Sequence, residues 1–149
     1  MSGFLLDTNV LSESRKVACN ANVKNWLEQQ SPATLYVSSI MLAEIRYGAS
    51  LVEDQNFRHT LLLWIDTVLR PWFEGRTLEV DEDIILRWRE MVQKGREQNY
   101  TFGQPDLFIA ALADVHGLCV VTRNVKDFEK AGVAVLNPWD DPAPGTESQ

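Results

Sequence analysis

Acidic residues that could bind a metal ion occur at three separated places in the chain. Asp7 directly follows the apolar run at 4–6 and is followed by Thr8 and Asn9, which add a hydroxyl and an amide. Glu44 lies in a segment with helical periodicity, and Asp106 begins an apolar stretch. Carboxylates without His or Cys ligands suit Mg²⁺ or Mn²⁺, and not Zn²⁺. If these acids meet, the chemistry they suit best is phosphodiester hydrolysis by metal-activated water.

Polar residues after a later apolar run add a fourth candidate position. Residues 118–121 are apolar throughout, which is typical of a buried parallel strand, and they lead into Thr122, Asn124 and Asp127. The carboxyl ends of parallel strands meet at one edge of a sheet, where ligands bind in open α/β folds. We therefore expect this turn to converge with the acids named above, with Glu44 reaching the edge from its helix.

Each acid also has an ordinary structural explanation. Asp7 could N-cap the following helix, and Asp106 could be favoured by the dipole of the helix it begins. Glu44 lies one turn from Ile40, so we expect it on the same apolar face, where a carboxylate is unfavourable unless it is paired or binds metal. An ion pair with Arg46 or another basic residue is the ordinary alternative.

Composition limits the class of protein. The chain has 149 residues, 45% of them hydrophobic, which fits a single domain with a substantial core. We find no apolar run long enough for a membrane span and no signal peptide, and we expect a cytoplasmic protein. The net charge of −7 argues against broad duplex binding, but bound cations reverse the local field, so a nucleic-acid enzyme stays possible.

The order of apolar patterns predicts the fold. Short strands are expected at 4–6, 35–38, 77–80, 118–121 and 133–136. Helices are expected at 20–30, 39–50, 57–69, from 81 onward, at 105–116 and at 125–131, with Ser39 as an N-cap and Pro71 ending the third. This alternation predicts an α/β fold, a three-layer α/β/α sandwich with a mainly parallel sheet. We expect residues 1–139 to form one domain and residues 140–149 to form a flexible acidic tail.

The helix at 57–69 carries more apolar residues than one core-facing stripe requires. The surplus indicates a second buried face, which is either a broad core face or a subunit interface. Its apolar residues are Phe57, Leu61, Leu62, Leu63, Trp64, Ile65, Val68 and Leu69.

Four segments together resemble the successive motifs of PIN-domain proteins. They lie at 5–13, 42–48, 105–113 and 121–128, and the chain then continues to Asn137-Pro138-Trp139. The closest resemblance is to VapC toxins, and within them to the FitB-like branch. It covers about residues 3–139, and the order and intervals of the motifs make it specific.

This resemblance implies a Mg²⁺-dependent endoribonuclease that is the toxin of a type II toxin–antitoxin pair; Mn²⁺ could substitute. The family's catalytic metal ligands correspond to Asp7, Glu44 and Asp106. Asn124 stands where many members have Asp, so the fourth position is open between Asn124 and Asp127. Residues that would orient these ligands are Thr8, Asn9 and Thr122. The implied partners are an RNA substrate, a VapB- or FitA-like antitoxin that blocks the acidic pocket, operator DNA through the antitoxin complex, and a second copy in a homodimer.

Three other functions fit the residues less well. A haloacid-dehalogenase-type phosphatase needs a second Asp two residues after the first, where this chain has Asn9. A receiver-like signalling module needs paired acids after its first strand and a late Lys, where Thr122 and Arg123 stand. A catalytically impaired PIN-like scaffold that only binds an antitoxin or other partner stays open because of Asn124.

Overall fold

The computed structural model describes residues 2–103 and 105–140. The predicted tail at 140–149 lies outside these residues, apart from Asp140. Within the two described ranges, no helix is both long enough and apolar enough to cross a membrane.

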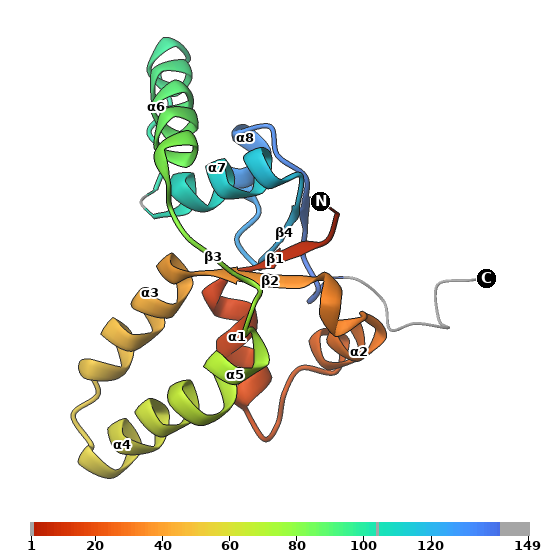
Figure 1. Cartoon of the computed structure of the whole chain (residues 1–149), viewed down its shortest axis with the longest axis vertical. Coiled ribbons are helices and arrows are strands. Elements are labelled where there is room, and N and C mark those ends of the chain that lie inside the picture. Colours follow the sequence, from red (N-terminus) through yellow and green to blue (C-terminus); the bar gives the residue numbers. More distant parts are fainter. Residues whose placement is uncertain (1, 104, 141–149) are drawn as a thin grey trace.

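A parallel sheet of five strands forms the centre of the molecule (Figure 1). Its order is β3-β2-β1-β4-β5, and the strands are β1 (Phe4–Leu6), β2 (Leu35–Ser38), β3 (Thr77–Leu78), β4 (Cys119–Val121) and β5 (Val135–Leu136). Leu5 of the central strand pairs with Tyr36 on one side and with Val120 on the other. Leu5, Leu6 and Val120 are fully buried because helices cover both faces of the sheet. The predicted strands are confirmed, although β3 and β5 are shorter than expected.

Helices cover both faces of this sheet (Figure 1). One layer contains α1 (Thr8–Arg15), α2 (Ala21–Gln29) and α5 (Arg70–Trp72), and the other contains α6 (Glu82–Glu97), α7 (Asp106–His116) and α8 (Lys126–Lys130). A short 3₁₀ turn, η1 (Pro32–Thr34), precedes β2. The hairpin of α3 (Ser39–Ser50) and α4 (Gln55–Trp64) projects from the sheet as an arm. The predicted three-layer α/β/α fold is therefore confirmed.

The exposed face of α3 differs from the prediction. Its buried residues are Met41, Leu42 and Ala49, whereas Tyr47 is 65% exposed and Glu44 is exposed. The buried face of α3 is therefore a different face from the one predicted from Ile40. The reason is that α3 packs against α1 and α4 as well as against the sheet. Glu44 therefore needs no partner to offset burial.

The cap of α3 also differs by one residue. Ser38, the last residue of β2, has extended backbone angles, and its hydroxyl accepts a hydrogen bond from the Ile40 amide at 3.2 Å. Ser39, the expected cap, is already helical. An N-cap residue requires this non-helical conformation, which the strand provides.

Pro71 does not end its helix as predicted. After α4, residues Ile65–Leu69 form a π-helical turn, η2, and Pro71 then lies within α5, which ends at Trp72. A proline inside a helix removes one amide donor and crowds the preceding turn. We attribute the wider turn before Pro71 to this constraint, since single π turns relieve such strain.

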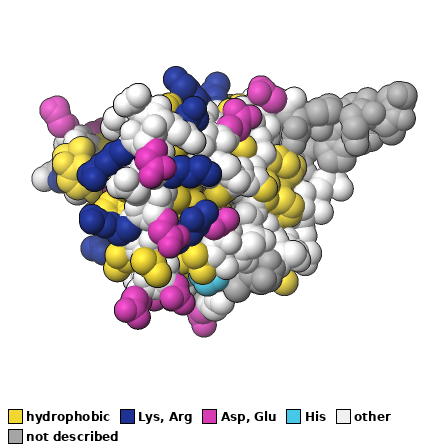
Figure 2. All heavy atoms as spheres, turned by 90° about the horizontal axis from the view of Figure 1, so that it is seen from above, with side chains coloured by type: hydrophobic (Ala, Val, Ile, Leu, Met, Phe, Trp, Pro, Cys, Tyr) yellow, Lys and Arg dark blue, Asp and Glu magenta, His cyan; other side chains and the backbone are white. Residues whose placement is uncertain are grey.

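The other layer is built around α7. Its residues Leu107 and Ile109–Ala113 are buried, and Phe108 stacks on Trp88 of α6 with ring centres 4.6 Å apart. Charged residues lie beside this contact: Arg87 of α6 pairs with Asp114 of α7 at 2.6 Å and with Glu90 of its own helix at 3.1 Å. Figure 2, which views the molecule from the α6 end, shows basic and acidic side chains alternating there. This mixed surface is typical of a solvated helix face.

Candidate active site

The candidate site lies at the point of the sheet where the strand order reverses. β1 is followed in the chain by β2, which lies on one side of it, whereas β4 lies on the other side. Such a switch point leaves a crevice outside the carboxyl ends of the strands, where ligands bind. Asp7 follows β1 and Thr122 follows β4, and the Asp7 amide donates to the Val121 carbonyl at 3.0 Å. The predicted convergence of these two strand ends is therefore present.

Asp7 is buried and held by several hydrogen bonds. Its side chain accepts from the Thr8 amide at 2.7 Å and from the Thr122 hydroxyl at 2.9 Å, and the residue is only 5% exposed. Burial raises the pKa of Asp7 above its ordinary value, although these hydrogen bonds act in the opposite direction. Asp7 also N-caps α1, so the structural role and the position at the site coexist.

Asn9 joins the two strand ends. The side-chain nitrogen Nδ2 of Asn9 donates to the Thr122 hydroxyl at 3.1 Å, and its side-chain oxygen Oδ1 accepts from the Arg123 backbone amide at 3.1 Å. The Thr122 hydroxyl also accepts from the Asn124 amide at 3.1 Å. Thr122 is fully buried, so this network fixes the orientation of Asp7 from within the protein. The Thr8 amide, the Asn9 side chain and the Thr122 hydroxyl therefore surround the Asp7 carboxylate, and their role in orienting metal ligands stays a prediction.

Asp106 provides the clearest sign that the acids lie together. It is the first residue of α7 and is partly buried. Burial, together with the negative charges of Asp7, Asp127 and Glu44, raises the pKa of Asp106 from its ordinary value of 3.8 to about 6. The carboxylates of four elements thus act on one another at this edge of the sheet. Among the described residues, no basic side chain contributes to the shift of Asp106.

Asp127 is held by a loop that the sequence did not identify as part of the site. Its carboxylate accepts from the Tyr100 hydroxyl and from the Gly103 amide, the latter at 2.8 Å. A Cβ atom at Gly103 would lie 3.1 Å from the Asp127 carboxylate and 3.8 Å from that of Asp106, so glycine allows the two acids to approach. The hydrogen bond to Asp127 raises the pKa of the Tyr100 hydroxyl.

Glu44 and Asn124 lie at the exposed rim. Both residues are exposed, and within the described part of the chain neither side chain forms a hydrogen bond or an ion pair. The alternative of an ion pair between Glu44 and Arg46 is therefore absent from the described residues. Asn124 is tied to the site only through its backbone amide, which donates to Thr122.

The donor set fits a hard divalent cation. Among residues 2–103 and 105–140, no three Asp, Glu, His or Cys side chains are close enough to hold one ion as they stand. Mg²⁺, however, usually keeps several waters and binds through one or two carboxylates. The repelling carboxylates around Asp106 are all oxygen donors, so Mg²⁺ or Mn²⁺ would relieve their repulsion. Asp7, Glu44 and Asp106 are the residues that would hold it, with Asp127 beside them.

Comparison with known proteins gives consistent results. A family model described as PIN domain matches residues 4–134. The plasmid stability protein StbB of Pseudomonas syringae pv. tomato is 38% identical, covering 92% of this chain and 99% of that protein. The VapC ribonuclease Y4jK of Sinorhizobium fredii is 33% identical, covering 92% and 98%. Toxin FitB of Neisseria gonorrhoeae is 34% identical, covering 93% and 99%.

Solved structures agree in fold over nearly the whole chain. The crystal structure of FitAcB from Neisseria gonorrhoeae superposes with a TM-score of 0.87 at 33% identity, covering 93% of this chain and 99% of that chain. The structure of FitAB bound to an IR36 DNA fragment gives a TM-score of 0.86 at 32% identity, covering 93% and 97%. The chain therefore belongs to the PIN-domain family.

Proposed function

We propose that this chain is a Mg²⁺-dependent endoribonuclease and the toxin of a type II toxin–antitoxin pair. The names of its relatives, VapC ribonuclease and Toxin FitB, support the reaction and the biological role. The observation that carries the proposal is the cluster of repelling carboxylates around Asp106, at the switch point of the sheet. A site with this much negative charge binds a phosphodiester only when cations neutralise it.

Each residue has a distinct role in this proposal. Asp7, Glu44 and Asp106 hold the ion, which supplies Lewis-acid stabilisation of phosphoryl charge and activation of water when it is bound. The Thr122 hydroxyl and the Thr8 amide keep Asp7 in one orientation. Asp127, fixed by the loop at 100–103, adds negative charge beside Asp106.

The proposed partners follow from the neighbours. FitAB was solved as a complex with DNA, which supports an antitoxin partner and operator DNA bound through the complex. Exposed apolar residues of α4 and of the turn after it offer a surface for a homodimer: Leu62, Leu63 and Val68. An RNA substrate would place the activity in the cytoplasm.

The test is cleavage of a mixed cellular RNA pool by the purified chain. We expect discrete products with Mg²⁺ and none with EDTA. Asp7→Asn, Glu44→Gln and Asp106→Asn should each lower the rate at least about a hundredfold while the fold is retained. Asp83→Asn, an exposed acid on α6, is the matched control and should cleave like the wild type.

Two outcomes would contradict the proposal. Normal cleavage by Asp106→Asn would show that the metal site is wrongly placed. A well-folded wild-type chain that cleaves no RNA with Mg²⁺ or Mn²⁺ would favour the binding scaffold, which the neutral Asn124 at the rim also fits.

A further inference from the structure

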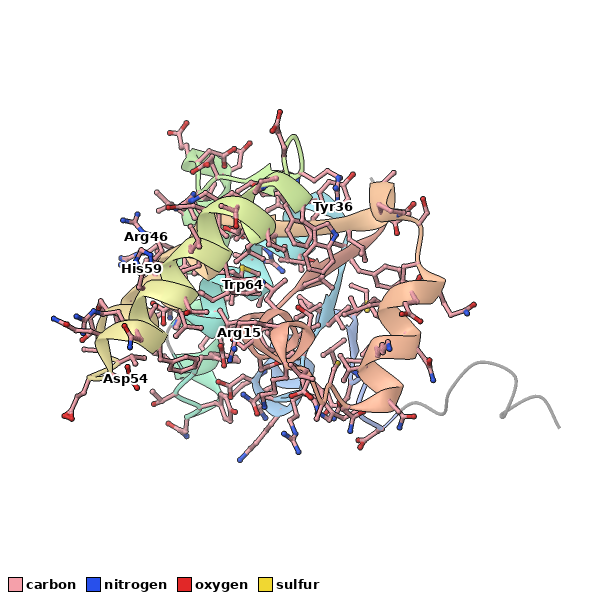
Figure 3. The ribbon with its side chains drawn as sticks, turned by 90° about the horizontal axis from the view of Figure 1, so that it is seen from below. Arg15, Tyr36, Arg46, Asp54, His59 and Trp64 are labelled. Atoms are coloured by element: carbon pink, nitrogen blue, oxygen red, sulfur yellow. The ribbon has the colours of Figure 1, made fainter. Side chains whose placement is uncertain are left out.

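A cleft opens beside the acidic site, between α1, α3 and α4. Its volume is about 330 Å³, within the range of roughly 300–1,000 Å³ that ligand sites usually have. Thr8 and Glu44 line it, so it is continuous with the site that contains Asp7. The rest of it is lined by Ser12, Arg15, Phe57 and Trp64, together with apolar residues of α3 and α4. Figure 3 shows Arg15 and Trp64 in the region where α1 and α4 face each other.

Arg15 is the cation of this cleft. It is the last residue of α1 and is partly buried, with its guanidinium carbon 5.5 Å from the centre of the Phe57 ring. Within the described residues, its guanidinium forms no hydrogen bond and no ion pair. In contrast, Arg58 donates to the Val52 carbonyl at 2.7 Å and Arg76 donates to the Leu35 carbonyl at 2.5 Å. The N–H donors of Arg15 are therefore free to bind an anion.

Aromatic residues of α4 form part of the lining of the cleft. Phe57 and Trp64 lie seven residues apart on α4, which places them on the same helix face, and both line the cleft with Leu61. Single-stranded RNA is recognised by stacking of bases on aromatic rings and by Arg contacts to phosphates. An Arg fork is well matched to the two oxygens of a phosphate.

We propose that this cleft binds one nucleotide of single-stranded RNA next to the scissile phosphate. Arg15 binds its phosphate, and Phe57 and Trp64 contact its base. The inference rests on the proposed ribonuclease function, because an RNA strand that crosses the acids continues into the cleft past Thr8 and Glu44. It would make Arg15 a substrate-positioning residue in a chain whose net charge of −7 otherwise repels RNA.

The experiment measures RNA binding separately from cleavage. Binding of a labelled single-stranded oligoribonucleotide is followed by fluorescence anisotropy in Mg²⁺ buffer, using the Asp106→Asn chain so that the RNA stays intact. Adding Arg15→Gln should weaken binding at least fivefold and reduce the slope of log K against log salt by about 0.7, the value for one phosphate contact on a single strand. Trp64→Leu should weaken binding without changing that slope.

Cleavage kinetics provide the second readout. In the otherwise wild-type chain, Arg15→Gln should raise KM for RNA about fivefold and leave kcat within twofold. Arg89→Gln is the matched control, since Arg89 is exposed on α6, away from the cleft. It should change neither KM nor the salt slope.

The outcomes separate this inference from the proposed function. Unchanged affinity and an unchanged salt slope for Arg15→Gln would overturn the nucleotide site, even if the same change weakened binding of a partner protein. If the wild-type chain cleaves no RNA, the proposed function fails, and the anisotropy measurement still decides whether Arg15 binds RNA.

Discussion

The two sides of the acidic site are held in different ways. On the sheet side, Asp7 is buried and accepts hydrogen bonds from Thr8 and Thr122, and Asn9 ties the two strand ends together. On the helix side, Glu44 is exposed, and Asp106 is partly exposed with a raised pKa. The comparison shows that hydrogen bonds of the fold fix the side chain of Asp7. The electrostatic repulsion acts on Asp106, whose side chain and that of Glu44 are not held by such a network.

The largest effect on stability should come from the sheet side. Thr122→Val keeps the shape of the side chain but removes the hydroxyl that donates to Asp7 and accepts from Asn9 and Asn124. We expect a loss of about 1–3 kcal/mol in the free energy of unfolding, because buried polar groups lose their partner. Urea denaturation measures this, with Thr101→Val, an exposed threonine of the loop, as control. A loss no larger than that of the control would show that the network does not hold Asp7.

The helix side should make stability depend on pH. The pKa of Asp106 is about 6 in the folded chain against an ordinary value of 3.8, so protonation favours the folded state. This stabilisation is complete below about pH 4 and is lost as the pH rises through about 6. The full shift corresponds to about 3 kcal/mol, which we reduce to about 1 kcal/mol because Asp106 is partly exposed.

Melting curves without metal, at pH 5 and pH 7.5, measure this effect. Since about half of the stabilisation is already lost at pH 5, the Tm should fall by about 1–2 °C at the higher pH, and this fall should largely disappear in Asp106→Asn. An equal fall in both proteins would place the titrating group elsewhere.

A smaller effect is expected at the rim. Asn124→Asp adds a carboxylate near the proposed ion, and we expect metal affinity equal to or a few times higher than that of the wild type. Isothermal titration with Mn²⁺ measures it. A tenfold loss of affinity would show that the amide is preferred at this position.

The smallest effect should come from the loop that holds Asp127. Tyr100→Phe removes one hydrogen bond to Asp127 and leaves the one from Gly103. Because this pair lies at the surface, we expect little change in Tm. A spectrophotometric titration of the wild type should show one tyrosine that ionises at a higher pH than the others, and this component should be missing in Tyr100→Phe. If all tyrosines of the wild type titrate together near pH 10, the hydrogen bond is absent in solution.

The sequence predicted the sheet side of the site better than the helix side. Asp7 and Thr122 follow apolar strands, and the carboxyl ends of parallel strands must meet, so their proximity could be inferred from short patterns. The prediction that Glu44 lies on the buried face of its helix was wrong. Apolar residues occur on several faces of α3, and only packing against α1 and α4 determines which face is buried.

Contacts made by loops left no signal in the sequence. Tyr100 and Gly103 lie in a loop, and their partner Asp127 is 27 and 24 residues away, so no local pattern indicates the contact. Pro71 was read by its usual role as a helix terminator, whereas the π turn before it allows the helix to continue to Trp72. In each case a tertiary contact or local backbone adjustment decided the outcome.

The central claim is that a divalent cation relieves repulsion among these carboxylates. The most direct measurement is the Tm of the wild type and of Asp106→Asn, each with EDTA and with saturating Mn²⁺ at pH 7.5. We predict that Asp106→Asn melts higher than the wild type in EDTA, and that Mn²⁺ raises the Tm of the wild type but hardly that of the variant. A wild-type Tm that does not respond to Mn²⁺, together with a variant that melts lower in EDTA, would contradict the account.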